Sequence, residues 1–206
     1  MQKTTERTRR RLLKTVGACA VVGTVASAGC IDGEPDEPPE ADDGTDDEQE
    51  DEPEEVALDE PAEFPEDADC PVCNMVPADH PDWNAQVVHD DGERAYFCSI
   101  GCMVAYTAYP DEFALSESDI VGAWVTEYGT GELIDGMDAY YALETDSDRV
   151  DDTMMLNPAA FRNRDDAVAY VDEVDYISED DVVGFEEFDA GLADRYRGQL
   201  TPGVEA

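Results

Sequence analysis

Two short segments gather the sulfur side chains of this sequence. The first is Cys70-Pro-Val-Cys73-Asn-Met75, and the second is Cys98-Ser-Ile-Gly-Cys102-Met103. Cys73 and Met75 are two residues apart, so in an extended segment their side chains point to the same side and can meet at one ion. Thiolate and thioether ligands select Cu(I), whereas carboxylates and water favour Mg²⁺ and Ca²⁺. The pair therefore predicts a site for a soft metal ion, with Cu(I) as the ion that it binds.

The second segment supplies further candidate ligands. Cys98 and Cys102 are four residues apart and would share one face of a helical turn. Met103 lies about 100° further round such a helix than Cys102, so the two side chains do not both face one site, and Met103 could instead pack in the core. His80 lies in a polar loop and His89 ends an apolar run; both are candidate additional ligands, with surface solvation as the alternative.

The same cysteines admit other interpretations. Outside the cytoplasm they could form two disulfides, and their spacing also suits a structural zinc ion held by all four thiolates. A thiol–disulfide or heavy-metal sensing module built on the pairs Cys70/Cys73 and Cys98/Cys102 is the main functional alternative. A thioredoxin-like centre is disfavoured because no βαβ unit adjoins the first pair. No nucleotide-binding loop or Ser/His/Asp order stands out, so we expect a metal-binding protein and not an enzyme.

The elements around the second segment are readable. Residues 83–89 and 94–98 have strand composition and flank a turn, which predicts a hairpin. Ser99 can cap a helix over residues 100–109, which Pro110 would end. Cys98 and Cys102 therefore belong to a junction between a strand and a helix.

The remainder suggests a second, related unit. Residues 120–128 form the clearest strand, with Val121, Ala123 and Val125 on one face, and a glycine turn leads back into 132–135. Further strands are predicted at 139–143, 153–156 and 159–163, and helices at 164–174, capped by Asn163, and 189–197. The order strand–strand–helix–strand thus occurs near 83–128 and again near 139–177. We predict an α+β fold of two related β-β-α-β units with antiparallel sheets.

Residues 1–30 are typical of a targeting segment. A basic stretch precedes an apolar run that is too short to span a membrane, and paired arginines followed by leucines resemble a twin-arginine export signal. Small residues lead into Cys30, which resembles the lipidated cysteine of a lipoprotein; an uncleaved anchor helix is the alternative. We therefore expect an extracytoplasmic protein anchored to the membrane through a lipid on Cys30.

Charge and composition define the next segment and the environment. Residues 31–69 are rich in Asp, Glu and Pro and contain no Lys or Arg, which predicts a disordered acidic tether before a folded domain at 70–206. The net charge of −41 argues against binding to nucleic acid. Self-repulsion of this size is mostly screened at molar salt, so the composition is typical of a protein from a very salty environment.

Taken in order, these motifs resemble the NosL family, lipoprotein copper chaperones associated with the maturation of nitrous oxide reductase. The resemblance rests on Cys70-Pro-Val-Cys73-Asn-Met75-Val, Pro81-Asp-Trp83-Asn-Ala-Gln-Val-Val, Phe97-Cys-Ser-Ile-Gly-Cys102-Met103-Val-Ala-Tyr and Met154-Met155-Leu-Asn-Pro-Ala-Ala-Phe161. It spans roughly residues 69–175.

The resemblance implies two related β-β-α-β units and Cu(I) bound through Cys73 and Met75, with a His as an optional further ligand. It also implies that the copper passes to nitrous oxide reductase or to its membrane-associated assembly complex. Two positions depart from the family pattern. Asn74 replaces the usual Gly, although Asn tolerates the left-handed backbone that such a turn needs. Cys98 stands where an acidic residue is common, which leaves open whether it adds a thiolate or pairs with Cys102.

Overall fold

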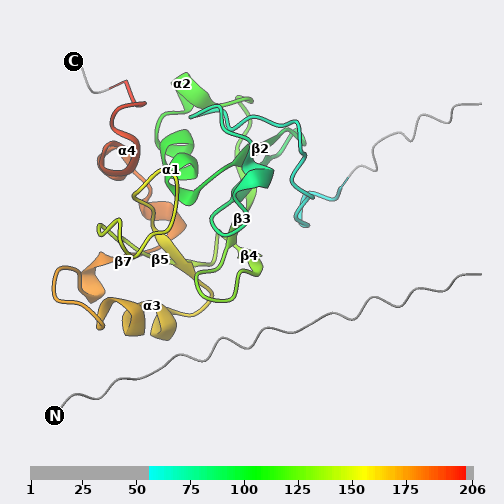
Figure 1. Ribbon diagram of the computed structural model, residues 1–206. Coiled ribbons are helices and arrows are strands. Elements are labelled where there is room, and N and C mark those ends of the chain that lie inside the picture. Colours follow the sequence, from blue (N-terminus) through cyan, green and yellow to red (C-terminus); the bar gives the residue numbers. More distant parts are fainter. Residues whose placement is uncertain (1–55, 203–206) are drawn as a thin grey trace, which may run out of the picture. The chain divides into compact units, whose positions relative to one another are not determined.

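The computed structural model describes residues 56–202, and Figure 1 shows their arrangement. The residues predicted to form the export signal, the predicted lipidation site Cys30 and the first part of the predicted tether, up to residue 55, lie outside the described residues. The strands are β1 (Ala85–His89), β2 (Arg94–Phe97), β3 (Ile120–Thr126), β4 (Leu133–Asp135), β5 (Tyr140–Ala142), β6 (Ala159–Phe161) and β7 (Val182–Val183). The helices are α1 (Ile100–Ala108), α2 (Pro110–Phe113), α3 (Arg164–Val171) and α4 (Ala190–Arg197), with short 3-10 turns at Pro77–Asp79, Glu179–Asp181 and Phe185–Glu187. Within 56–202, no helix combines the length and apolar character needed to cross a bilayer.

The strands form two antiparallel sheets with the same internal order. The first sheet runs β2-β1-β3-β4 and the second runs β6-β5-β7. In each, the first strand lies between the second and the third, and the third arrives after a helix, α1 or α3; the first sheet has β4 as an additional edge strand. The structure thus confirms the predicted α+β fold of two β-β-α-β units.

The two units correspond residue by residue where hairpin meets helix. Phe97 pairs with the first residue of β1 and Phe161 with the first residue of β5. Each phenylalanine is followed, nine positions later, by a buried tyrosine on the helix, Tyr106 or Tyr170. By this alignment Cys98 and Cys102 of the first unit correspond to Arg162 and Asp166 of the second. The second unit therefore lacks the two sulfur atoms at its own junction.

The helices pack in two groups, with α4 on α1 and α3 on the second sheet. Figure 1 shows α4 beside α1, and α3 beside β5 and β7, in agreement with the packing of these elements. One core cluster includes side chains of both units, among them Phe97, Ile100, Tyr141 and Tyr196. A smaller cluster lies between α3 and its sheet. The C-terminal helix is consequently packed on the helix that carries Cys102.

The predicted tether extends too far. Ala62 exchanges two hydrogen bonds with the buried side chain of Gln86, at 2.9 and 2.8 Å, and Arg94 donates to the carbonyls of Ala57 and Glu60. Phe64 also lies edge-on to Tyr96 in β2. Residues 56–69 therefore belong to the folded domain. Composition was misleading because backbone groups and the ring of Phe64, and not the acidic side chains of this segment, make these contacts.

Other element predictions need smaller corrections. Residues 153–156 form a turn instead of a strand, because Met155 has a left-handed φ of 67° and Leu156 N donates to the carbonyl of Met154. A bulge between β1 and β3 turns Val121 outward, so it does not share the buried face of Ala123 and Val125. Helix α3 ends at Val171 rather than 174, and the two-residue strand β7 was not predicted.

Candidate metal centre

The first pair of cysteines lies on a tight turn. The amide of Cys70 donates to the carbonyl of Met75 at 2.8 Å, and the amide of Asn74 donates to the carbonyl of Cys70 at 2.8 Å. Asn74 has a φ of 58°, so the residue that replaces the usual Gly does adopt the left-handed conformation. The segment from Cys73 to Met75 is therefore not extended, and this backbone lacks the alternation by which the two side chains were expected to point to the same side.

The second pair lies at the junction of β2 and α1. Cys98 follows the last residue of β2, Ser99 is the N-cap of α1, and Cys102 lies in the first helical turn. The side chain of Ser99 makes no capping bond to the helix backbone. Its hydroxyl is instead a hydrogen-bond acceptor for Arg197. The residue that sequence reasoning treats as a helix cap thus links the metal site to α4.

Turn and junction bring the four sulfur atoms together. Cys70, Cys73, Cys98 and Cys102 place their Sγ atoms within 4.8 Å of one another. The Sγ atoms of Cys73 and Cys98 are 3.2 Å apart, and those of Cys98 and Cys102 are 3.8 Å apart. Four thiolates around one ion at a metal–sulfur distance of about 2.3 Å would be about 3.8 Å apart at the corners of a tetrahedron. The donor set fits a single soft metal ion.

The four thiols differ in their access to solvent. All four cysteines are free thiols, with no disulfide among them. Cys70, Cys98 and Cys102 are fully buried, whereas Cys73 is partly exposed. A metal ion in this cluster would therefore be shielded on three sides and approachable at Cys73.

A buried arginine reaches the cluster from α4. Arg197 is fully buried, and its Nε donates to Cys102 Sγ at 3.1 Å. The other guanidinium nitrogens donate to the hydroxyl of Ser99 and to the carbonyls of Leu156 (2.8 Å) and Tyr196 (2.6 Å). Among residues 56–202, Arg197 forms no ion pair with a carboxylate. Its charge therefore faces the sulfur atoms without a carboxylate in contact.

Two features of the surroundings hold the guanidinium in place. A Cβ atom at Gly101 would lie 2.8 Å from Cζ of Arg197, so the glycine between the cysteines leaves the space that the guanidinium occupies. The amide of Gly101 donates to Asn157 Oδ1 at 2.6 Å, which attaches the loop before β6 to the start of α1. Leu156, in the same loop, supplies one of the carbonyls that accept from Arg197. The second half of the chain thus encloses a site whose sulfur atoms all come from the first half.

The electrostatics of the cluster favour one thiolate at Cys102. Hydrogen bonds from Cys70, Cys73 and Cys98, assisted by the positive charge of Arg197, hold the pKa of Cys102 well below that of an ordinary thiol. Hydrogen bonding to Cys102 raises the pKa of Cys70 and of Cys98. A metal ion that recruits the remaining thiolates would release their protons, so binding should be coupled to proton release.

The other predicted ligands lie in different environments. Met75 ends the Cys70 turn and packs, partly buried, against the main core, and Met103 is completely buried in that core. His80 lies in the loop after the first 3-10 turn and is not a member of the cysteine cluster. The Met75, Met103 and His80 ligand assignments remain predictions.

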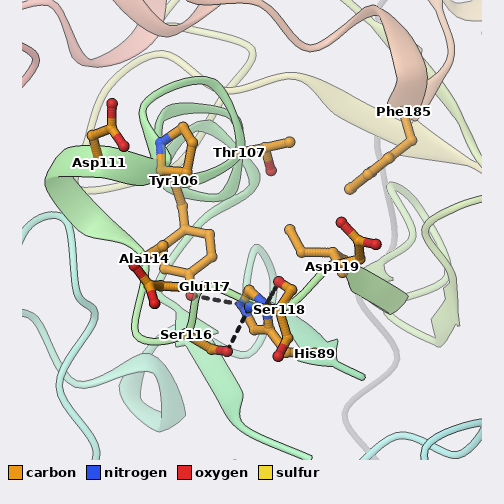
Figure 2. Close-up of a pocket in the computed structure, with 12 residues that line it drawn as sticks. His89, Tyr106, Thr107, Asp111, Ala114, Ser116, Glu117, Ser118, Asp119 and Phe185 are labelled. Carbon is orange, nitrogen blue, oxygen red and sulfur yellow. Dashed lines mark hydrogen bonds between the residues drawn. The ribbon is translucent and has the colours of Figure 1, made fainter. Parts of the chain in front are cut away.

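His89 is occupied elsewhere. Its Nδ1 is 2.7 Å from the carbonyl of Ser118, and its Nε2 is 2.8 Å from the hydroxyl of Tyr106. The ring borders a pocket whose other lining residues include Asp111, Glu117 and Asp119, and no cysteine lines that pocket (Figure 2). Both ring nitrogens therefore have partners within the fold, away from the sulfur cluster.

Arg197 is the residue that sequence reasoning missed. It lies 95 positions after Cys102, so no local motif connects the two. One signal was readable: Arg197 is four residues after Ala193, on the buried face of α4, in a chain that has no lysine after Lys14. A cation on an apolar helix face requires a buried partner.

The fold and the site together define a small α+β protein with a thiol cluster capable of holding a metal ion. A family model described as NosL matches residues 61–187, and the chain belongs to the NosL family. A search of solved structures finds a similar fold in the crystal structure of the copper chaperone NosL from Shewanella denitrificans. That match has 12% sequence identity and a TM-score of 0.50, and it covers 64% of this chain and 97% of the other. No curated protein matches the sequence.

Proposed function

We propose that this protein is an extracytoplasmic copper chaperone that binds Cu(I) at the cluster of Cys70, Cys73, Cys98 and Cys102. The observation that carries the proposal is the convergence of four sulfur atoms within 4.8 Å. Soft thiolates select Cu(I) over the hard cations of a salty medium, although carboxylates are far more numerous on this chain. Family membership, and the copper chaperone with the similar fold, support copper as the cargo.

Unequal burial of the thiols suits a protein that passes its metal on. Three buried thiolates would retain the ion, and the partly exposed Cys73 would be the sulfur that an acceptor's ligand displaces first. Met75, close in sequence to Cys73, is the ligand that the family resemblance adds. As the acceptor we propose nitrous oxide reductase or its membrane assembly complex, with this chain held at the membrane by a lipid on Cys30.

The direct test is an anaerobic titration with Cu(I) in competition with a Cu(I) chelator, at constant molar salt. The wild-type protein should bind one Cu(I), and Cys73→Ser and Cys102→Ser should each weaken binding by at least tenfold. Met155→Leu is a matched control, because it removes a sulfur from an exposed side chain that is no member of the proposed site. Met75→Leu should leave the Cu(I) affinity unchanged if the site consists of four thiolates, and should lower it if the thioether of Met75 is also a ligand. Unchanged affinity in both cysteine variants would refute the site.

A structural zinc ion is the second candidate, because the separations of 3.2 and 3.8 Å also approach those of a tetrahedral zinc site. Zinc would then co-purify in stoichiometric amount, and its removal by a chelator would unfold the domain. For a chaperone, the metal-free protein should keep its circular dichroism spectrum. Thiol counting in the reduced and air-exposed protein tests the thiol–disulfide alternative, since the fold as described contains four free thiols.

A further inference from the structure

The cation that faces the sulfur cluster has a role which the ligands alone do not explain. Arg197 is fully buried, and a buried charge is costly unless it is paired. Its partners within the described chain are the sulfur of Cys102, a hydroxyl and two carbonyls, none of which carries a full negative charge unless the sulfur is a thiolate. Asp152 interacts with Arg197 only through space, without an ion-pair contact. The guanidinium is therefore part of the charge of the metal site.

We propose that Arg197 is a specificity-determining residue that favours a monovalent over a divalent metal ion in the cysteine cluster. The proposal rests on the proposed function and concerns the same site. It follows from the position of one fixed positive charge that touches a ligand sulfur without touching the metal. Arg197 is thus a positioning and selecting residue, and it is not itself a ligand.

The geometry sets the size of the effect. Arg197 Nε is 3.1 Å from Cys102 Sγ, and a metal ion would lie about 2.3 Å beyond that sulfur, so the two cations are no more than about 5.4 Å apart. A divalent ion experiences twice the repulsion that a monovalent ion does. For a single extra charge at about 5.4 Å, with an effective dielectric constant of about 20, the dissociation constants of the two metals are separated by about 200-fold. The attraction between Arg197 and the thiolates is the same with either metal bound, so it cancels in the ratio of the two dissociation constants.

The fold provides for this charge specifically. Gly101 leaves the space for the guanidinium, and Ser99 contributes its hydroxyl to Arg197 instead of capping α1. Arg195 supplies a matched comparison: it lies on the same helix with the same charge but is exposed to solvent. Proximity to the sulfur, and not the charge of α4, is what the proposal requires.

The test compares the dissociation constants of Cu(I) and Zn(II), each measured by competition with a chromogenic chelator on the reduced full chain at one fixed molar salt concentration. In Arg197→Gln the preference for Cu(I) over Zn(II) should fall by about 10- to 200-fold. Arg195→Gln should leave the preference within threefold of wild type. Arg197→Lys, which retains the charge, should preserve most of the preference for Cu(I) over Zn(II).

A second variant neutralises the cation without removing it. Ser99→Asp places a carboxylate against the guanidinium and supplies a residue that is favoured at a helix N-cap, so α1 should remain stable. It should lower the metal preference as Arg197→Gln does. A preference within threefold of wild type in both Arg197→Gln and Ser99→Asp would overturn the proposal. Absence of Cu(I) binding by the wild-type protein would instead refute the proposed function.

Discussion

Replacing Gly101 by alanine tests the arrangement around the buried guanidinium. The new Cβ would lie 2.8 Å from Cζ of Arg197, whereas an ordinary contact is 3.4 Å or longer, so the guanidinium must move by about 0.6 Å. Hydrogen bonds join it to a sulfur, a hydroxyl and two carbonyls, which limits how far it can move. A position inside a helix would otherwise gain up to about 1 kcal/mol from the exchange of Gly for Ala.

The expected balance is a loss of stability. Overpacking costs about 1–3 kcal/mol, and weakening one hydrogen bond of a buried charge costs about 1.5–3 kcal/mol. After the helix gain is subtracted, Gly101→Ala should lower the free energy of unfolding by about 1.5–5 kcal/mol. Urea denaturation at constant molar salt, followed by circular dichroism, measures this change.

Gly191→Ala is the matched control for this prediction. Gly191 is an exposed glycine of α4 whose added Cβ would lie 3.3 Å from Asp189 Oδ1, a much smaller conflict than at Gly101, so the same exchange should change the free energy of unfolding by less than about 1 kcal/mol. In an Arg197→Met background, Gly101→Ala should no longer be destabilising, because the clashing group is gone. Should Gly101→Ala prove as stable as wild type, the guanidinium would not lie where the structure places it.

Three further predictions concern other parts of the chain. Asn74 has a φ of 58°, so Asn74→Ala should cost about 1 kcal/mol in urea denaturation while Asn74→Gly costs little; equal stability of the two variants would contradict the left-handed turn. Burial would raise the pKa of Glu144, but hydrogen bonds from Tyr170, Tyr176 and two backbone amides outweigh this effect and lower the pKa below 4.5. The carboxylate therefore stabilises the fold above that pH. This stabilisation is lost as the pH falls through the lowered pKa. Glu144→Gln should therefore lose about 2 kcal/mol at pH 7 and progressively less in acid, and a pH-independent difference would refute this. Finally, with a net charge of −41, the domain should lose circular dichroism signal as salt falls from molar to tens of millimolar, whereas an unchanged spectrum would contradict the role given to charge.

Local sequence signals predicted most of the fold and the cysteines as candidate metal ligands, but not the contacts between residues far apart in the sequence. The positions of the hairpin, α1 and α4 follow from apolar patterns, turn residues and the proline after α1, and these are properties of neighbouring residues. The packing of residues 56–69 on β1 and β2 depends on backbone groups and on the single ring of Phe64, which the composition of an acidic segment does not reveal. The link between Cys102 and Arg197 depends on the packing of α4 against α1, which no spacing rule encodes.

The enclosure of the sulfur cluster by the second half of the chain has a consequence for the order of folding. All four sulfur atoms come from residues 70–102, a stretch that includes a 3-10 turn, the first hairpin and the start of α1. Arg197 and Asn157 arrive from distant positions, and contacts of long sequence separation carry the larger entropic cost of closure. Until α4 docks, the chain would carry the complete set of thiols without their counter-cation. Metal captured at that stage would encounter a site of different charge, and the final selectivity would be established only when α4 seals it.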